Sequence, residues 1–332
     1  MTTSAMWRGG DRRRDSIDYH FHIRWSRCHP RTGVCMEPRD VAAGLAEGVE
    51  SFDRLFSALW SPIGAATVKA ARLRPGVHVL DACCDSGASA IPAAEQVSPH
   101  GVVDAVDLAE SSLERGRAKA TIRGVSNVRF MHGDVLDWPA PTGGYDAVVC
   151  SLGISSFPDV AAGTERLLRL VRPGGRLTVT IWSQGALGPL PELIHRAVVP
   201  ERPRPADVPW LVNPLQPMGT QRLFRDWLAA RSLSFIDVQY VPLAVPGDPD
   251  LLWSLVSGTR CRGLLDGLPV AAVERVRRRF TAGLLAEGRE TIDFSVLVGT
   301  GTLRRVAPPR SPRSARSLLA VGRPIGPVPR IG

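Results

Sequence analysis

The stretch Val77-His78-Val79-Leu80-Asp81-Ala82-Cys83-Cys84-Asp85-Ser86-Gly87 decides the fold of this chain. Its apolar first half, residues 77–81, is typical of a short buried strand that ends in an acid. The small residues of 82–87 predict a tight loop, and the pattern of 88–97 predicts a helix after it. A strand, a short loop and a helix in this order are the opening unit of a parallel α/β sheet.

The same alternation continues along the chain. Strands are expected over residues 101–107, 127–132, 145–151, 176–182, 235–242 and 291–301, with helices between most of them. Two helices are expected before the first strand, the second starting with Ser61 as its N-cap, and a helix over 159–171 should break at Arg172-Pro173-Gly174-Gly175. Near-continuous apolar strands separated by amphipathic helices indicate a sheet that is covered on both faces. Residues 183–217 are rich in proline, so regular structure should give way there.

Acidic residues follow three successive strands. Asp81 ends the first, Asp107 ends the second, and Asp134 lies just past the third. In an open α/β sheet, ligands bind outside the carboxyl ends of the strands, where such carboxylates accept hydrogen bonds from ribose hydroxyls, an ammonium or an amine. A single such acid would more often be a turn former, but three in successive loops indicate a ligand site.

Five motifs, in their order and spacing, resemble the class I S-adenosylmethionine-dependent methyltransferases, and within them the group of quinone-biosynthesis and small-molecule methyltransferases. They are the stretch of residues 79–87, Val106-Asp107, Gly133-Asp134-Val135, Tyr145-Asp146-Ala147-Val148-Val149, and Leu170-Val171-Arg172-Pro173-Gly174-Gly175. The resemblance is strong over residues 49–182. It implies a Rossmann-like doubly wound sheet, mostly parallel with an antiparallel last strand, N-terminal lid helices and an inserted cap.

The resemblance also implies a cofactor site for S-adenosylmethionine. The loop from Asp81 through Cys83 and Asp85 to Gly87 would pass under the methionine end. Asp107 would bind the ribose hydroxyls and Leu108 would pack on the adenine. At the adenine edge would lie Asp134 and Val135. Bordering the methyl group would be Cys150 and Ser151, and the lid helix would carry Phe52 and Asp53.

The loop departs from the family pattern at two of its three glycine positions. Where relatives commonly carry G-C-G-T-G, this chain has residues 83–87 with Gly87 alone retained, and Asp85 adds a charge that could repel the cofactor carboxylate or attract its cationic groups. A nicotinamide dehydrogenase would need glycine at Cys83 and Asp85, so this alternative is disfavoured. Residues 151–154 lack the N/D-P-P-Y/F motif of nucleic-acid amino-methyltransferases, so we do not expect a nucleic-acid substrate.

The expected function is methyl transfer to a small-molecule acceptor, on oxygen or carbon; a non-catalytic cofactor-binding scaffold of the same fold is the alternative. Such a transfer needs alignment and exclusion of water but no metal. His195 is the candidate general base, against the alternative of an ordinary surface-helix histidine. The side chains of Trp182, Trp210 and Phe224 could line an apolar acceptor pocket or simply pack in the core.

The net charge of +9 is concentrated at the two ends of the chain. Residues 1–35 carry +4 and residues 303–332 carry +7, which leaves −2 for the body. We therefore expect two disordered Arg-rich tails around a methyltransferase domain over 36–302, with a substrate cap inserted at 183–233. Five residues near the N-terminus could in principle bind a metal, but their spacing matches no known metal site: His20, His22, Cys28, His29 and Cys35. No C-x-x-C pair occurs. With no apolar run long enough to span a membrane, the expectation is a cytoplasmic protein.

Overall fold

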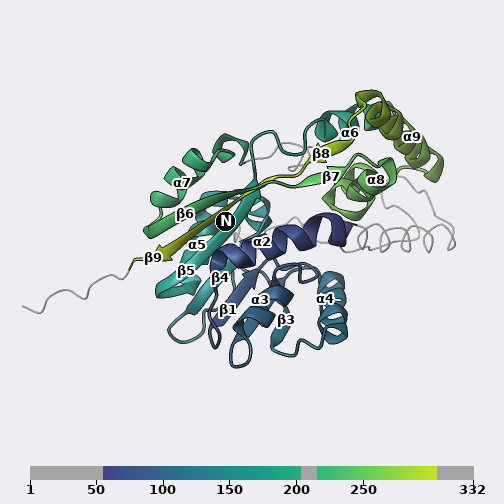
Figure 1. Ribbon diagram of the computed structural model, residues 1–332. Helices are drawn as coiled ribbons and strands as arrows, with labels where there is room; N and C mark the ends of the chain where they lie inside the picture. Colours follow the sequence, from purple (N-terminus) through teal and green to yellow (C-terminus); the bar gives the residue numbers. More distant parts are fainter. Residues whose placement is uncertain (1–54, 203–214, 305–332) are drawn as a thin grey trace, which may run out of the picture.

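A computed structural model describes residues 55–202 and 215–304, and its centre is a seven-stranded sheet in the order β3-β2-β1-β4-β5-β9-β6 (Figure 1). Strands β1 to β5 are parallel, and β9 runs antiparallel to both β5 and β6. This confirms the doubly wound, mostly parallel α/β sheet with an antiparallel last strand. The strands are β1 (His78–Ala82), β2 (Val102–Asp107), β3 (Val128–His132), β4 (Tyr145–Ser151), β5 (Val171–Trp182), β6 (Leu233–Val241) and β9 (Val296–Leu303).

The order of the strands creates a switch point between β1 and β4. The chain moves outward from β1 through β2 to β3, and then returns to the other side of β1 to form β4. Because the connections on the two sides run in opposite directions, a crevice opens at the carboxyl ends of β1 and β4. This is where a ligand is expected.

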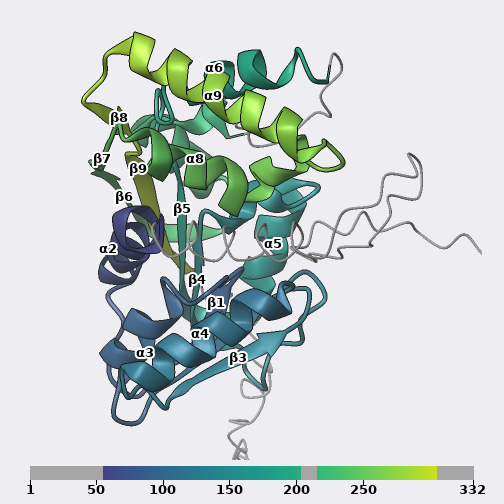
Figure 2. The same cartoon turned by 90° about the vertical axis from the view of Figure 1, so that its right-hand side faces the viewer.

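Helices cover both faces of the sheet. On one face α2 (Ser61–Ala71), α3 (Ala90–Val97) and α4 (Glu110–Ile122) pack against side chains such as Val79. On the other face α5 (Val160–Leu170) and α7 (Gln221–Ala229) pack against side chains such as Leu80. Figure 2 shows α2 and α5 on opposite sides of the sheet. The alternation of Val79 and Leu80 between two cores is the period of two that a strand buried on both faces requires.

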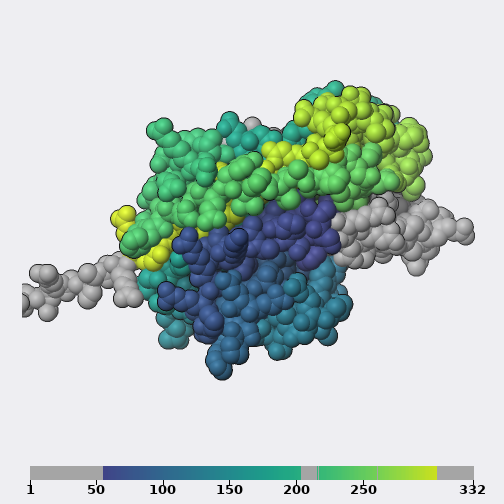
Figure 3. All heavy atoms as spheres, viewed as in Figure 1, coloured from purple at the N-terminus to yellow at the C-terminus, as the bar shows by residue number. Residues whose placement is uncertain are grey.

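A separate group of helices, here called the helical cap, lies at one end of the molecule (Figure 2). It comprises α6 (Leu190–Val198), α8 (Pro249–Gly258), η4 (Arg260–Leu264), α9 (Val270–Glu287) and the two-stranded sheet of β7 (Ala244–Pro246) and β8 (Thr291–Asp293). Its apolar side chains form one buried cluster, which Leu59 of η1 (Phe56–Trp60) and Ile63 of α2 also join. In Figure 3 the purple surface of α2 lies between the green and yellow surface of the later part of the chain and the blue surface of α3 and α4. Helix α2 therefore connects the cap with the sheet.

The cap differs from the insertion expected over 183–233. Helix α7 packs on the main sheet, where Phe224 and Leu228 are fully buried, whereas α8, η4 and α9 join α6 in the cap. The proline-rich stretch nevertheless contains α6, because a proline in the first turn of a helix occupies a position where no N–H is needed. The helices η2 (Gly153–Ser156) and η3 (Gln216–Met218) are short 3₁₀ turns.

Three other boundaries differ from those expected. The last strand divides into β8 and β9, because the Asp293 carboxylate accepts a hydrogen bond from the Ser295 N–H at 2.7 Å and turns the chain. Strand β5 already pairs at Val171, and its register shifts before it resumes at Arg176. Ser61 is not an N-cap, because Trp60 is helical and η1 continues into α2. The remaining boundaries agree to within a few residues.

The C-terminal tail expected from residue 303 overlaps the end of β9 at Leu303, and only its part beyond Arg304 lies outside the described residues. The N-terminal tail with its His and Cys residues, Phe52, Asp53 and Trp210 also lie outside them. Among the helices that the structure does describe, none has the length and apolar character needed to cross a bilayer.

Candidate active site at the switch point

The loop between β1 and α3 follows the path of a glycine-rich loop although it has only one glycine. Cys83, Asp85 and Gly87 have φ of 59°, 46° and 86°, so all three glycine positions of the family pattern take left-handed backbone. For a residue with a side chain this conformation costs roughly 1–2 kcal/mol, and aspartate tolerates it better than most. Hydrogen bonds from Cys84 N–H to the Val106 carbonyl at 3.1 Å and from Gly87 N–H to the Cys84 carbonyl at 2.9 Å hold the loop in place.

Asp107, at the end of β2, organises this loop. Its Oδ2 accepts a hydrogen bond from the Asp85 N–H at 2.9 Å, and its Oδ1 accepts one from the Ala109 N–H, also at 2.9 Å. A carboxylate can accept about four hydrogen bonds, so each oxygen retains a lone pair for a ribose hydroxyl. Leu108 follows and is half-buried beside it. Both residues fit the nucleoside part of the cofactor.

Asp81 presents a buried acceptor atom that lacks a partner. The Ser89 hydroxyl donates to its Oδ2 at 2.7 Å, whereas its Oδ1 has no hydrogen-bond partner among the described residues. Burial raises the pKa of Asp81 to about 7. The hydrogen bond from Ser89 opposes this rise, and the negative charge of Asp107 adds a smaller increase. A buried carboxylate oxygen without a partner is costly, so this position fits a ligand that brings a cationic or N–H donor. The residues present therefore fit S-adenosylmethionine.

The Asp85 side chain is directed toward α4. It bonds with Ser112, and the charges of Arg115 and Lys119 act on it, while its Oδ1 is enclosed without a hydrogen-bond partner among the described atoms. Burial raises the pKa of Asp85, and these α4 groups oppose that rise. The charge that replaces the family's glycine is thus held beside two cationic side chains.

The loop after β3 brings Asp134 to the same edge of the sheet. Asp134 Oδ1 accepts a hydrogen bond from the Leu136 N–H at 2.8 Å and so caps its own turn. The Val135 side chain is buried in the core on the α5 side, where it contributes packing. Only the half-buried Asp134 therefore offers a side chain to a ligand at this position.

Cys150, near the end of β4, and Gly153, just after it, lie on the β4 side of the switch point. Cys150 is fully buried, and a Cβ at Gly153 would lie 2.6 Å from Cys83 Cβ and 2.7 Å from Cys150 Sγ. Such distances exclude any side chain at this position, so Gly153 lets the loops after β1 and β4 approach each other.

Three of the residues expected on the acceptor side are described by the structure, and these three are not brought together. His195 is exposed on α6, opposite the buried residues of that helix, and Phe224 packs in the sheet core against Trp227 with ring centroids 5.9 Å apart. Trp182 ends β5 and meets Phe294 edge-on at 6.0 Å, next to the cap. Of His195, Phe224 and Trp182, therefore, only Trp182 lies near the carboxyl edge of the sheet.

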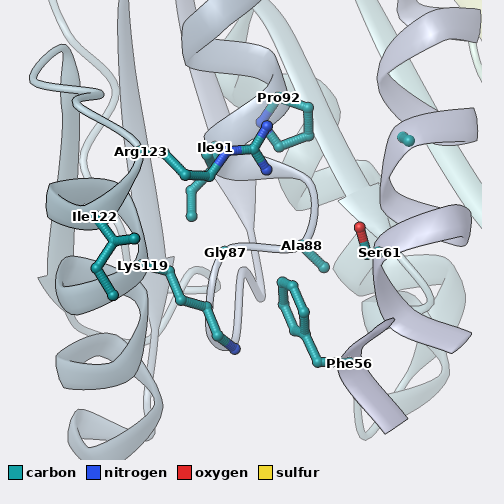
Figure 4. A pocket seen from close by; sticks show the side chains of 10 residues that line it. Phe56, Ser61, Gly87, Ala88, Ile91, Pro92, Lys119, Ile122 and Arg123 are labelled. Atoms are coloured by element: carbon teal, nitrogen blue, oxygen red, sulfur yellow. The ribbon is translucent and has the colours of Figure 1, made fainter. Parts of the chain in front are cut away.

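A feature that the sequence did not indicate is a cavity of about 280 Å³ beside the β1–α3 loop, between α2, α3 and α4 (Figure 4). At its mouth Lys119 Nζ lies 3.4 Å from the centroid of the Phe56 ring and 3.3 Å from Ser86 Oγ. Of the residues expected to hold the cofactor, Gly87 lines the cavity, whereas Asp81, Asp107 and Asp134 do not. The one available signal was that Lys119 is one of two lysines in the chain. Over residues 55–202 and 215–304, no three His, Cys, Asp or Glu side chains are grouped to hold a metal ion.

Comparisons with known proteins found a matching family and several similar proteins. The model of the ubiE/COQ5 methyltransferase family matches residues 55–193. The chain is similar to nocamycin O-methyltransferase of Saccharothrix syringae, with 32% identity over 287 residues that cover 80% of this chain and 97% of that protein. It is also similar to demethylmenaquinone methyltransferase of Listeria monocytogenes serotype 4a, with 34% identity over 118 residues that cover 36% of this chain and half of that protein. The YcgJ protein of Bacillus subtilis superimposes with a TM-score of 0.47 at 19% identity, covering 74% of this chain and 99% of that one.

These findings do not favour the non-catalytic scaffold. The likeness to enzymes covers both the cofactor loops and most of the chain beyond them. The chain belongs to the ubiE/COQ5 methyltransferase family and is an S-adenosylmethionine-dependent methyltransferase that acts on a small molecule.

Proposed function

We propose that this enzyme methylates a hydroxyl oxygen of its small-molecule acceptor, and that the helical cap covers that acceptor. The choice of oxygen is supported by how much of this chain aligns with each of the two relatives, the O-methyltransferase and the demethylmenaquinone methyltransferase. A match over 80% of a 332-residue chain includes residues from about 67 to 266 wherever it begins, so the likeness to the O-methyltransferase reaches α6 and α8 of the cap. The likeness to the demethylmenaquinone enzymes is limited to 118 residues.

In the proposed mechanism, the loops after β1, β2 and β3 bind the cofactor. The methyl acceptor binds on the β4 side of the switch point, under the cap. S-adenosylmethionine supplies, when bound, a methyl group already activated by a sulfonium. Asp107 and Asp134 would hold the nucleoside part, and Asp81 would accept a hydrogen bond from the methionine part. The acceptor oxygen would bond to the methyl carbon as the carbon–sulfur bond breaks, and the hydroxyl proton would leave to solvent as the acceptor ionises. The chain's remaining task is to align the acceptor oxygen with the methyl carbon and to keep water from the methyl group, because positioning is its main contribution to such a displacement.

The exposed His195 has no place in this mechanism. We further infer a cytoplasmic location, supported by the absence of a disulfide at the described cysteines Cys84, Cys150 and Cys261.

The test combines binding with product analysis. Calorimetry measures the affinity for S-adenosylmethionine, and a panel of phenols, enols and carbon acids is incubated with the protein and cofactor. Mass spectrometry then locates the added methyl group. We expect products methylated on oxygen; cofactor binding together with carbon methylation alone would contradict the proposal.

Asp107→Ala tests the cofactor site in the same assay. It should reduce cofactor affinity by about 1.5–3 kcal/mol, because hydrogen bonds to a charged acceptor are lost and the β1–α3 loop loses an anchor. Asp137→Ala, at an exposed position of the loop after β3, is the matched control and should leave affinity unchanged. His195→Ala should leave turnover unchanged. Equal affinities for the parent and a folded Asp107→Ala protein would remove Asp107 from the site.

A further inference from the structure

Three hydroxyl groups meet beneath α2 at the carboxyl edge of the sheet. The Thr67 hydroxyl of α2 lies 2.7 Å from Thr180 Oγ1 of β5 and 3.3 Å from Ser151 Oγ at the end of β4. Thr67 and Thr180 are fully buried, whereas Ser151 is half-buried. The cluster therefore runs from the protein interior to a partly open end.

The direction of the hydrogen bonds in this cluster follows from proton count. Thr67 Oγ1 lies 2.9 Å from the Ile63 carbonyl oxygen, which can only accept, so the single hydroxyl proton of Thr67 is used there. Thr67 must then accept from both neighbours. Thr180 donates to it, and Ser151 donates to it as well. Both lone pairs of Thr67 are thereby occupied.

Ser151 is left as a hydrogen-bond acceptor. Its proton is directed toward Thr67, and among the hydrogen bonds of the described residues its oxygen receives none. Its lone pairs are therefore available to a group that brings its own proton. The longer 3.3 Å contact leaves the serine hydroxyl room to adjust to such a group.

Ser151 lies at the carboxyl edge of the sheet, on the strand next to the one that carries Asp81. Asp81 of β1 pairs with Val149 of β4, two residues before Ser151, and Ser151 pairs with Thr180. Ser151 thus stands at the switch point, on the boundary between the cofactor strands β1–β3 and the cap side. A small molecule held under the cap would approach the cofactor past this residue.

We propose that Ser151 recognises the acceptor by accepting a hydrogen bond from its hydroxyl group, and that Thr67 is a positioning residue that orients Ser151 through this cluster. The proposal rests on the proposed O-methylation and adds a specificity-determining residue to it. The cluster ends at a backbone carbonyl and contains no titratable group, so Ser151 orients the acceptor hydroxyl and does not remove its proton. A substitution should therefore change recognition without displacing the pH profile of turnover.

The experiment measures recognition of a hydroxyl directly. The probes are 2-naphthol and naphthalene, which share an apolar body and differ in the hydroxyl group, and both bind to protein saturated with S-adenosylhomocysteine in a fluorescence titration. The measured quantity is the ratio of the two Kd values. Ser151→Ala and Thr67→Val should each reduce the preference for the naphthol by about two- to tenfold, the usual scale of one net hydrogen bond, while Thr67→Ser retains the hydroxyl and the preference.

The matched control is Thr164→Val. Thr164 is fully buried in α5 and makes the same kind of bond, to the Val160 carbonyl at 2.7 Å, but belongs to no such cluster. It should leave the ratio unchanged, as should the affinity of every variant for S-adenosylhomocysteine. Because Ser151 is half-buried, its alanine variant is also informative if Thr67→Val does not fold.

Each outcome bears on the proposal. An unchanged ratio in Ser151→Ala overturns it, and so does a parent protein that does not bind 2-naphthol. A ratio that falls in Ser151→Ala but not in Thr67→Val removes the positioning role of Thr67. Loss of the preference in a protein that methylates only carbon acids would support Ser151 as a hydroxyl-recognition residue while contradicting the proposed function.

Discussion

At the scale of single residues, the active site depends on carboxylates held in unusual surroundings. Asp81 is fully buried, with one oxygen that has no hydrogen-bond partner among the described residues, Asp85 occupies left-handed backbone, and Asp107 links the loops that follow β1 and β2. The arrangements of Asp81 and Asp85 cost free energy in the protein without ligand. Such costs are typical of a site prepared for a cationic ligand.

The raised pKa of Asp81 makes stability depend on pH. The folded protein binds the proton of this carboxyl more tightly than the unfolded chain, whose pKa is near 3.8, so the favourable contribution is complete at low pH and is lost as pH rises through about 7. Asp81→Asn removes this dependence. Between pH 5 and pH 8 the parent should lose roughly 1–3 kcal/mol of unfolding free energy relative to Asp81→Asn, measured by urea denaturation without cofactor. Parallel pH curves for the two proteins would contradict the assignment.

Asp85→Gly tests whether the departure from the family pattern weakens cofactor binding. Glycine adopts the observed φ without strain, and the backbone N–H that donates to Asp107 is retained. We expect the variant to bind S-adenosylmethionine at least as tightly as the parent in calorimetry. A large loss of affinity would instead show that the Asp85 carboxylate, supported by α4, is an adapted part of the site.

At the scale of elements, α2 connects the cofactor loop, the sheet and the cap. It contributes Ile63 to the cap cluster, Thr67 to the hydroxyl cluster and Val68 to the core beneath α3. Its Gly64 lies against the β1–α3 loop so closely that a Cβ there would stand 2.2 Å from the Ala88 carbonyl oxygen. The position of the loop is thus set by a helix that precedes it in the chain.

Gly64→Ala should disturb this contact. A backbone atom cannot move aside as a flexible side chain can, so the variant should lose about 1–3 kcal/mol of unfolding free energy and bind S-adenosylmethionine more weakly. Gly263→Ala is the control, because a Cβ at Gly263 has no neighbour within 4 Å, and it should change stability by less than about 0.5 kcal/mol. If the two variants were equally stable, the packing of α2 on the loop would be less tight than described.

At the scale of the whole molecule, the positive charge is concentrated at the two ends of the chain, whereas the body between them is close to neutral. The body carries −2, whereas residues 1–35 and 303–332 carry +11 together. Polyanion affinity should therefore come from the ends of the chain and not from the active-site domain.

Removal of residues 1–35 and 305–332 should separate these properties. Retention on a heparin column should fall strongly, because binding to a polyanion scales with the number of cationic contacts. Circular dichroism and cofactor affinity should stay unchanged, since both segments lack apolar periodicity in the sequence. Loss of folding on truncation would mean that one of these segments packs on the domain.

The sequence by itself determined the sheet and the placement of three acids at its carboxyl edge. Local patterns of apolar and small residues located β1 to β5 to within a few residues, except where β5 begins early, and they placed Asp81, Asp107 and Asp134 at or just past the ends of β1, β2 and β3. These features are local, because a buried strand and the acid that ends it are adjacent in the chain.

Only the tertiary structure decided the composition of the cap, the direction of the Asp85 side chain and the hydroxyl cluster. Helix α6 pairs with α9, some seventy residues later, and Thr67 meets Thr180 across 113 positions. The exposure of His195 likewise depended on which face of α6 the distant cap helices cover. Such contacts join elements that are far apart in the chain, so no local pattern specifies them, and the burial of each side chain is set by its partners.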